Sequence, residues 1–207
     1  MLKILALTPL LAALCAPAAA GETSAAQFLR LGAGARALGM AGACAAVGEG
    51  AESAYYNPAS YAQASPRGEL SLSHSWHVQD TGLTHGAYAR RGWGASFTWF
   101  SAGDLEGRDD SGNPTGSFTA EDAALSAGAA FRWRGAAAGF SLKGIRQRIQ
   151  DKGATAAAAD LGLLYPAEPD VPLRLGLSVS NLGSKIKFET ESYPLPVTWR
   201  AALAMRP

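Results

Sequence analysis

From Gly68 onward, apolar and polar residues alternate one by one along most of the chain. The clearest runs are Leu173–Val179 and Val197–Met205, in which every second residue is hydrophobic. A period of two residues is typical of β-strands, whose successive side chains point to opposite faces. The pattern predicts about eight antiparallel strands of roughly ten residues, a length that suits tilted membrane-spanning strands. The other expected strands are 69–76, 83–91, 93–99, 126–133, 140–143 and 160–165.

Turn residues separate these expected strands. Two connections, Arg91–Gly92 and Arg134–Gly135, are very short, and further turns are expected at Asp151–Gly153 and Glu168–Asp170. The connection from Ser101 to Glu121 is expected to be a long polar loop. Short turns at one end of the strands and long loops at the other are typical of outer-membrane barrels.

Soluble β-sandwiches alternate in the same way, so the chemistry of the two faces has to decide between the folds. The polar face carries small residues and isolated charges, which suits a lumen better than an exposed sheet. The pattern therefore favours an all-β fold, an antiparallel transmembrane β-barrel of the outer-membrane type, with a secreted sandwich as the alternative. Aromatic residues support the barrel because they gather near strand ends on the apolar face, as in interfacial girdles: Trp76, Trp93, Trp99, Phe131, Trp133, Tyr165 and Trp199.

The residues before the first strand show no such alternation. Residues 1–20 read as a cleaved secretory signal peptide, with Lys3, an apolar stretch too short to span a bilayer, and three alanines before Gly21. Residues 21–67 are rich in glycine and alanine and are expected to form a plug-like segment. Residues 68–207 are expected to supply the barrel strands, and the protein is expected in the outer membrane.

Composition excludes several other classes of protein. Charged residues make up only 17% of the chain and the formal net charge is +1, which argues against disorder and against nucleic-acid binding. Removal of the signal peptide leaves Cys44 as the only cysteine, so no intramolecular disulfide can staple the fold. No later stretch approaches the length of apolar chain that a transmembrane helix needs.

Several segments resemble a known family. Residues 28–62 resemble the opening of the PorV/PorQ family, with Gly34–Ala43 matching its glycine-rich run and Tyr55–Ala59 matching its YWNPA element. Ala41 and Tyr56 depart from the family pattern. The family is related to the FadL-type long-chain fatty acid transporters, so the resemblance implies a FadL-like outer-membrane barrel of about fourteen strands. It continues through 140–149, 160–165 and 173–188.

The resemblance implies two non-enzymatic functions. The relation to FadL-type transporters implies passage of hydrophobic small molecules across the outer membrane. The resemblance to PorV-like proteins implies a partner of type IX secretion that holds exported proteins at the surface. A structural scaffold is a third alternative. The expected partners are outer-membrane lipid and either a hydrophobic ligand or secretion-machinery proteins. Because the chain stops at Arg206–Pro207 and proline cannot join a ladder, we expect an incomplete part of a larger barrel, with a short variant as the alternative.

The first group of candidate functional residues lies in the N-terminal segment. By resemblance to FadL, it belongs to a plug whose movement gates a lumen; the alternative is a tight turn at Asn57–Pro58 that leads into the first strand. We expect Gly34–Ala59 to pack against the inner face of the sheet. The residues of this motif are Gly34, Arg36, Gly39, Gly42, Asn57, Pro58 and Ala59.

The second group consists of charges that alternation places on the polar, lumen-facing side. Lys143 and Asp160 lie on neighbouring expected strands and can pair across the sheet. The whole set is either tolerated in a wet interior or forms a basic rim that attracts an anionic head group such as a carboxylate. These residues are Arg132, Lys143, Asp160, Arg174 and Arg200.

No pattern indicates catalysis or metal binding. Gly32–Ala37 fits the dinucleotide fingerprint loosely, but no βαβ unit surrounds it. The acidic residues of 101–121 do not follow the order of a calcium loop, and His74 and His77 fall on opposite faces of a strand. No nucleophile lies beside a base. We therefore expect no catalytic residue, no metal and no cofactor.

Overall fold

The computed structural model describes residues 23–168, 171–188 and 190–205, so the expected signal peptide, 1–20, lies outside the described residues. Short helices are confined to the N-terminal part: η1 (Gln27–Arg30), α2 (Ala35–Gly39), η2 (Ala51–Tyr55) and η3 (Pro58–Gln63). The rest is mostly β-structure: β1 (Glu69–Trp76), β2 (Gly82–Arg90), β3 (Trp93–Arg108), β4 (Pro114–Trp133), β5 (Ala136–Ile149), β6 (Lys152–Glu168), β7 (Val171–Gly183), β8 (Ile186–Phe188), β9 (Glu191–Tyr193) and β10 (Thr198–Met205).

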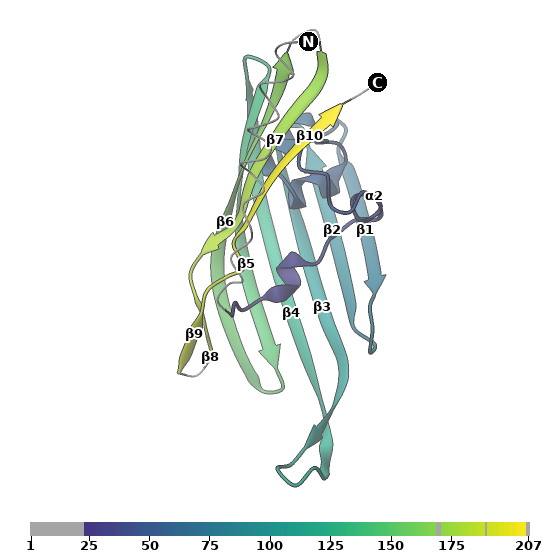
Figure 1. The fold of residues 1–207 in the computed structure, drawn as a ribbon, viewed down its shortest axis with the longest axis vertical. Helices are drawn as coiled ribbons and strands as arrows, with labels where there is room; N and C mark the ends of the chain where they lie inside the picture. Colours follow the sequence, from purple (N-terminus) through teal and green to yellow (C-terminus); the bar gives the residue numbers. More distant parts are fainter. Residues whose placement is uncertain (1–22, 169–170, 189, 206–207) are drawn as a thin grey trace, which may run out of the picture.

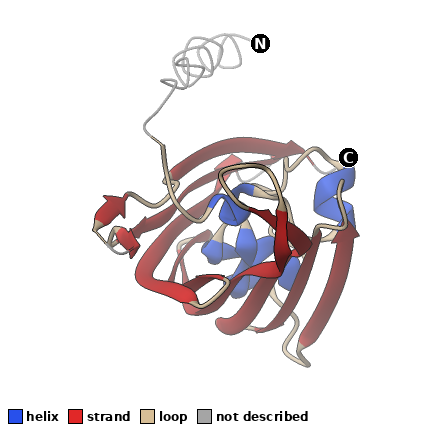
Figure 2. Cartoon of the chain, turned by 90° about the horizontal axis from the view of Figure 1, so that it is seen from below, coloured by secondary structure: helices blue, strands red, loops and turns tan. Residues whose placement is uncertain are grey.

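Eight strands form one antiparallel sheet in the order β1-β2-β3-β4-β5-β6-β7-β10. The sheet is curled like half of a barrel, and the short helices lie on its concave side (Figures 1 and 2). Among the described residues, β1 and β10 are the two edges and do not pair with each other. The prediction of an all-β antiparallel sheet of eight strands is confirmed at this level.

The structure differs from the sequence prediction between Ser101 and Glu121. The expected loop is instead an extension of the β3–β4 hairpin, paired from Asp104↔Thr119 to Gly107↔Gly116 and closed by a turn at 109–113. A bulge between Ser101 and Asp104 marks where the extension begins. Both faces of the extension are mainly polar and exposed, so hydrophobic alternation gave no signal there. The short β8–β9 hairpin escaped prediction because three-residue strands are too short for periodicity.

The register of the ladders assigns each strand residue to the convex or the concave face. Large hydrophobic side chains on the convex face are exposed, with Leu70 at 81%, Trp76 at 82% and Trp199 at 78%. A soluble sheet normally buries its apolar face, so this sheet has the reverse arrangement. No Asp, Glu, Lys or Arg occupies a convex position within 69–76, 82–89, 93–101, 123–133, 136–145, 154–165, 173–179 or 199–205.

The concave face is covered by residues 23–67, which we call the N-terminal segment (Figure 2). Its apolar side chains form the core together with inward residues of the sheet. One cluster joins Phe28 and Leu29 to Leu83, Ala124 and Ile145. Within the described residues the helices are short, and none has the length and apolar character to cross a membrane.

Candidate functional site

Inward-facing glycines allow backbone and side-chain atoms of the N-terminal segment to approach the wall of the sheet closely. An added Cβ at any of them would come within 2.5 Å of an atom of the segment, which is closer than real Cβ contacts allow. The absence of a side chain is therefore required by the close approach. The four positions and the residues they meet are Gly94 with Tyr61, Gly139 with Pro58, Gly162 with Asn57 and Gly176 with Ala45.

Asn57 joins the N-terminal segment to two strands at once. Its Oδ1 accepts a hydrogen bond from the backbone N–H of Ala59 at 3.1 Å and so caps η3. Its Nδ2 donates to the carbonyl oxygen of Ala45 at 2.7 Å and to that of Leu163 on β6 at 3.1 Å, with a longer contact of 3.4 Å to Leu177 on β7. The side chain is fully buried. A buried amide with all its partners supplied fixes the position of the segment on the wall.

The remaining motif residues divide into two parts. Pro58 and Ala59 are buried on the wall beside Asn57. The glycine-rich part lies near β1 instead, where the N–H of Gly34 donates to Ser73 Oγ at 3.3 Å. Gly34 and Gly42 have φ of +85° and +78°, which favour glycine. The structure shows no close contact that requires glycine at position 39. Arg36 lies 3.5 Å from Glu49 in an exposed ion pair.

The five charges of the polar face all lie on the concave side, and three arginines reach the N-terminal segment. Arg132 Nε donates to the carbonyl oxygen of Ala62 at 3.1 Å, and Arg174 Nη1 donates to that of Val47 at 2.7 Å. The guanidinium of Arg200 lies 5.7 Å from the ring centre of Tyr56 and donates to Ser180 Oγ at 3.0 Å. All three arginines therefore contact the segment, and Arg132 is also exposed to solvent, so a basic rim that attracts an anionic head group stays a prediction.

Lys143 and Asp160 form a buried ion pair across β5 and β6. Lys143 Nζ lies 3.1 Å from Asp160 Oδ2, and the two side chains are only 10% and 7% exposed. Lys143 also donates to Asn181 Oδ1 at 2.8 Å, while Asp160 accepts from the backbone N–H of Asn181 at 2.8 Å and from Ser141 Oγ at 3.0 Å. Asn181 Nδ2 donates in turn to the carbonyl oxygen of Pro196 at 3.1 Å. A buried pair needs such extra hydrogen bonds to offset desolvation.

A small polar cavity lies between this ion pair and the N-terminal segment. Tyr55 and Tyr61 close it from the segment side, and hydroxyl groups of the inner face complete its lining. Tyr55 Oη donates to the carbonyl oxygen of Leu31 at 2.6 Å. Burial raises the pKa of the Tyr61 hydroxyl to about 12, so this group stays neutral at physiological pH.

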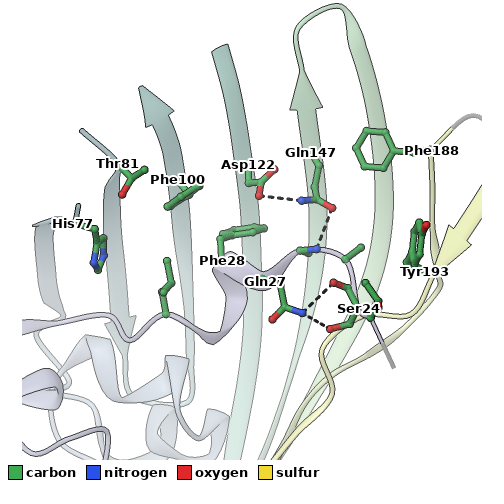
Figure 3. A pocket seen from close by; sticks show the side chains of 14 residues that line it. Ser24, Gln27, Phe28, His77, Thr81, Phe100, Asp122, Gln147, Phe188 and Tyr193 are labelled. Carbon is green, nitrogen blue, oxygen red and sulfur yellow. Dashed lines mark hydrogen bonds between the residues drawn. The ribbon is translucent and has the colours of Figure 1, made fainter. Parts of the chain in front are cut away.

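A larger and mostly apolar pocket of about 620 Å³ opens at the end of the sheet where β3 and β4 extend. One wall is the start of the N-terminal segment, and the others are the inner ends of β3 to β5 and the β8–β9 hairpin (Figure 3). Its volume lies within the range of small-molecule sites. The aromatic side chains that line it are Phe28, Phe100, Phe188 and Tyr193.

Two polar residues of the inner face connect this pocket to the N-terminal segment. Gln147 Nε2 donates to Asp122 Oδ2 at 2.9 Å, and Gln147 Oε1 accepts from the backbone N–H of Ala26 at 3.1 Å (Figure 3). Gln147 therefore joins β4, β5 and the chain just before η1. Movement of the segment away from the wall would break this contact and widen the pocket.

Sequence reasoning missed the pocket, the wall glycines and Gln147, although Asn57 and the arginines were among the candidate residues. Gly94, Gly162 and Gly176 were visible as polar-face positions of alternating runs, and glycine there was the one available signal of close approach. Phe28, Phe188 and Asp122 come from distant parts of the chain, so no local pattern connects them. Within the part of the chain that the structure describes, no three His, Cys, Asp or Glu side chains gather where they could hold a metal ion.

No protein-family model matches the chain, and no curated protein matches it.

Proposed function

We propose that this chain is a non-enzymatic outer-membrane β-barrel protein, similar to the PorV/PorQ and FadL-type proteins that its motifs resemble, and that it passes hydrophobic small molecules across the outer membrane. The observation that carries the proposal is the apolar pocket between the N-terminal segment and the inner face of the sheet. The N-terminal segment acts as a plug on the route that begins at this pocket.

The convex face supports a membrane location. A wide band of exposed leucine, phenylalanine and tryptophan side chains with no charged residue is costly in water, and such bands on soluble proteins are rare. Lipid is the solvent that such a face matches. A closed β-barrel is one of the two structures that satisfy every backbone hydrogen bond within a bilayer, and the curled sheet has the curvature of half of such a barrel (Figure 2).

Plug movement is supported by the nature of the contacts that hold the N-terminal segment. On the β4–β7 wall they are side-chain hydrogen bonds to backbone carbonyls, as at Asn57, Arg132 and Arg174, and close packing on glycines. Neither kind of contact is covalent, and the segment adds no strand to the sheet. Its displacement would therefore leave the ladders intact while opening the concave side.

The orientation of the strands is tested by Leu142→Arg. Leu142 lies on the convex face of β5 and is 63% exposed. In lipid, the variant is expected to lower the free energy of unfolding by about 2–4 kcal/mol, because a charge near mid-membrane is desolvated. Denaturant titration of protein refolded into lipid vesicles measures this change.

Thr115→Arg, in the exposed polar extension of the β3–β4 hairpin, is the matched control and should change stability by less than about 0.5 kcal/mol. Equal and small effects of both variants, or recovery of the intact protein in solution without detergent, would contradict the membrane location.

Passage is tested by uptake of a hydrophobic fluorescent dye into cells of a Gram-negative host that carry the protein in the outer membrane. Phe188 lines the pocket from the β8–β9 hairpin, outside the main sheet, and packs at the margin of the core, so Phe188→Ala is a milder change than a charged substitution. Loss of roughly 1.4 kcal/mol of apolar contact is expected to weaken dye binding, and with it initial uptake, about tenfold.

Lys187→Ala on the same exposed hairpin is the control and should leave uptake unchanged. Uptake no greater than in cells without the protein would count against passage. The secretion partner and the scaffold would then become the better proposals.

A further inference from the structure

The polar side chains that line the pocket include a negative charge without a basic residue to balance it. Among the described residues that line the pocket, Asp122 is the one carboxylate, and none is Lys or Arg. His77 and Thr81 approach from the β1–β2 turn, and His77 is an exposed side chain at the side of the pocket (Figure 3). Tyr193 Oη on the opposite side donates to Glu191. The field inside the pocket is therefore set mainly by the Asp122 carboxylate.

One carboxylate oxygen of Asp122 accepts a hydrogen bond within the protein, and the other can accept one from a ligand. Its Oδ2 accepts from Gln147 Nε2, and Gln147 is itself held by the N–H of Ala26. Among the described residues, Oδ1 has no hydrogen-bond partner, and no ion pair reaches the carboxylate. The side chain is half-buried. A carboxylate held partly out of water without a counter-ion is unfavourable, and a bound cation would relieve it.

The basic side chains of the concave face have other partners than Asp122. Lys143 is paired with Asp160, and Arg132 and Arg174 donate to carbonyl groups of the N-terminal segment. A ligand with a carboxylate head would find no counter-ion in the pocket and would meet Asp122. The pocket is lined in contrast by three phenylalanine rings, which offer apolar contact, and aromatic rings attract organic cations more than organic anions: Phe28, Phe100 and Phe188.

We propose that the pocket selects hydrophobic organic cations, molecules with an aromatic or alkyl body and a single amine or ammonium group that pairs with Asp122 Oδ1. This inference rests on the proposed function, because it names the ligand class of the same pocket. Charge complementarity supplies the selection, and the apolar walls supply most of the affinity.

The test uses the full protein in nanodiscs of phosphatidylcholine, which has no net charge. Binding of phenylbutylamine, phenylbutanol and phenylbutyrate is measured by equilibrium dialysis, with empty nanodiscs as the background. The three probes share one body and differ in the charge of the head. The amine is expected to bind about tenfold more tightly than the butyrate, which corresponds to one partly buried charge pair.

Asp122→Asn keeps the shape of the side chain and an oxygen that can accept from Gln147, but removes the charge. Affinity for the amine is expected to fall about tenfold, while affinity for the alcohol stays within about twofold. Retained binding of the alcohol shows that the variant has folded. Glu106→Gln, an exposed carboxylate on the β3–β4 extension, should leave the preference for the amine unchanged.

The possible outcomes separate this inference from the proposed function. Binding of the alcohol with no preference for the amine, or a preference that survives Asp122→Asn, would overturn the inference while leaving passage of hydrophobic molecules intact. Binding of none of the three probes above the background would remove the pocket as a ligand site, and with it both proposals.

Discussion

The Gly139→Ala variant is expected to displace the N-terminal segment from the concave face. Gly139 lies on β5 below η3, and an added Cβ would come within 2.5 Å of the carbonyl group of Pro58 and 2.6 Å of the backbone nitrogen of Ala59. These are backbone atoms in a buried turn, so neither side can yield cheaply. One methyl group is therefore expected to cost about 2–3 kcal/mol of the contact between the segment and the wall.

Cys44 provides a direct measurement of this displacement. The thiol lies within the N-terminal segment, is 3% exposed, and packs against Ala37 and Tyr56. Burial raises the pKa of the Cys44 thiol and keeps it protonated, which further slows its reaction. In a chain produced from Gly21 onward it is the only cysteine. Gly139→Ala is expected to speed labelling of Cys44 by a water-soluble maleimide at least about tenfold.

Gly144→Ala is the matched control on the same strand. Its Cβ would point to the convex face, where no atom lies within 4 Å. The added methyl group should be neutral or slightly stabilising, because alanine suits a strand better than glycine does. If both variants labelled Cys44 at the rate of the unchanged protein, packing on the glycines would not be what holds the segment.

Asn57→Ala is expected to have the second large effect. The substitution removes the cap of η3 and leaves the carbonyl groups of Ala45 and Leu163 without their donor in a buried site. Such losses sum to roughly 3 kcal/mol. The midpoint of denaturant unfolding in detergent micelles, followed by tryptophan fluorescence, measures the change.

Asn57→Asp separates the two roles of Asn57, capping of η3 and donation to the carbonyl oxygens of Ala45 and Leu163. An aspartate caps a helix as well as asparagine does, but it cannot donate to the carbonyls and would bury a charge beside them. The aspartate variant should therefore be at least as unstable as the alanine variant. Asn113→Ala removes an exposed contact to Asp109 in the β3–β4 turn and should cost less than about 1 kcal/mol. If Asn57→Asp proved as stable as the unchanged protein, capping alone would be the role of Asn57.

The strands themselves could be predicted because the alternation of apolar and polar residues that marks a strand involves only residues close together in the sequence. Alternate residues are apolar along β10 and, except for His74, along β1, and the structure gives both strands a strict alternation of exposed and half-buried positions. The same period placed Lys143 and Asp160 on one face, and neighbouring strands made their pairing foreseeable. In Asp104–Arg108 of the β3–β4 extension both faces are mainly polar, so the sequence shows no hydrophobic alternation there. The prediction of a loop at this place was wrong.

The sequence by itself determined the strands, their short turns and the chemistry of their two faces, since each depends on residues within a few positions of one another. The tertiary structure alone decided how residues 23–67 lie on the sheet, because that contact joins Asn57 to Leu163 and Gly139 to Pro58 across long stretches of chain. It also decided that the arginines anchor this segment and that Asp122 faces an apolar pocket. Side chains that meet only when the sheet curls leave no periodic trace in the sequence.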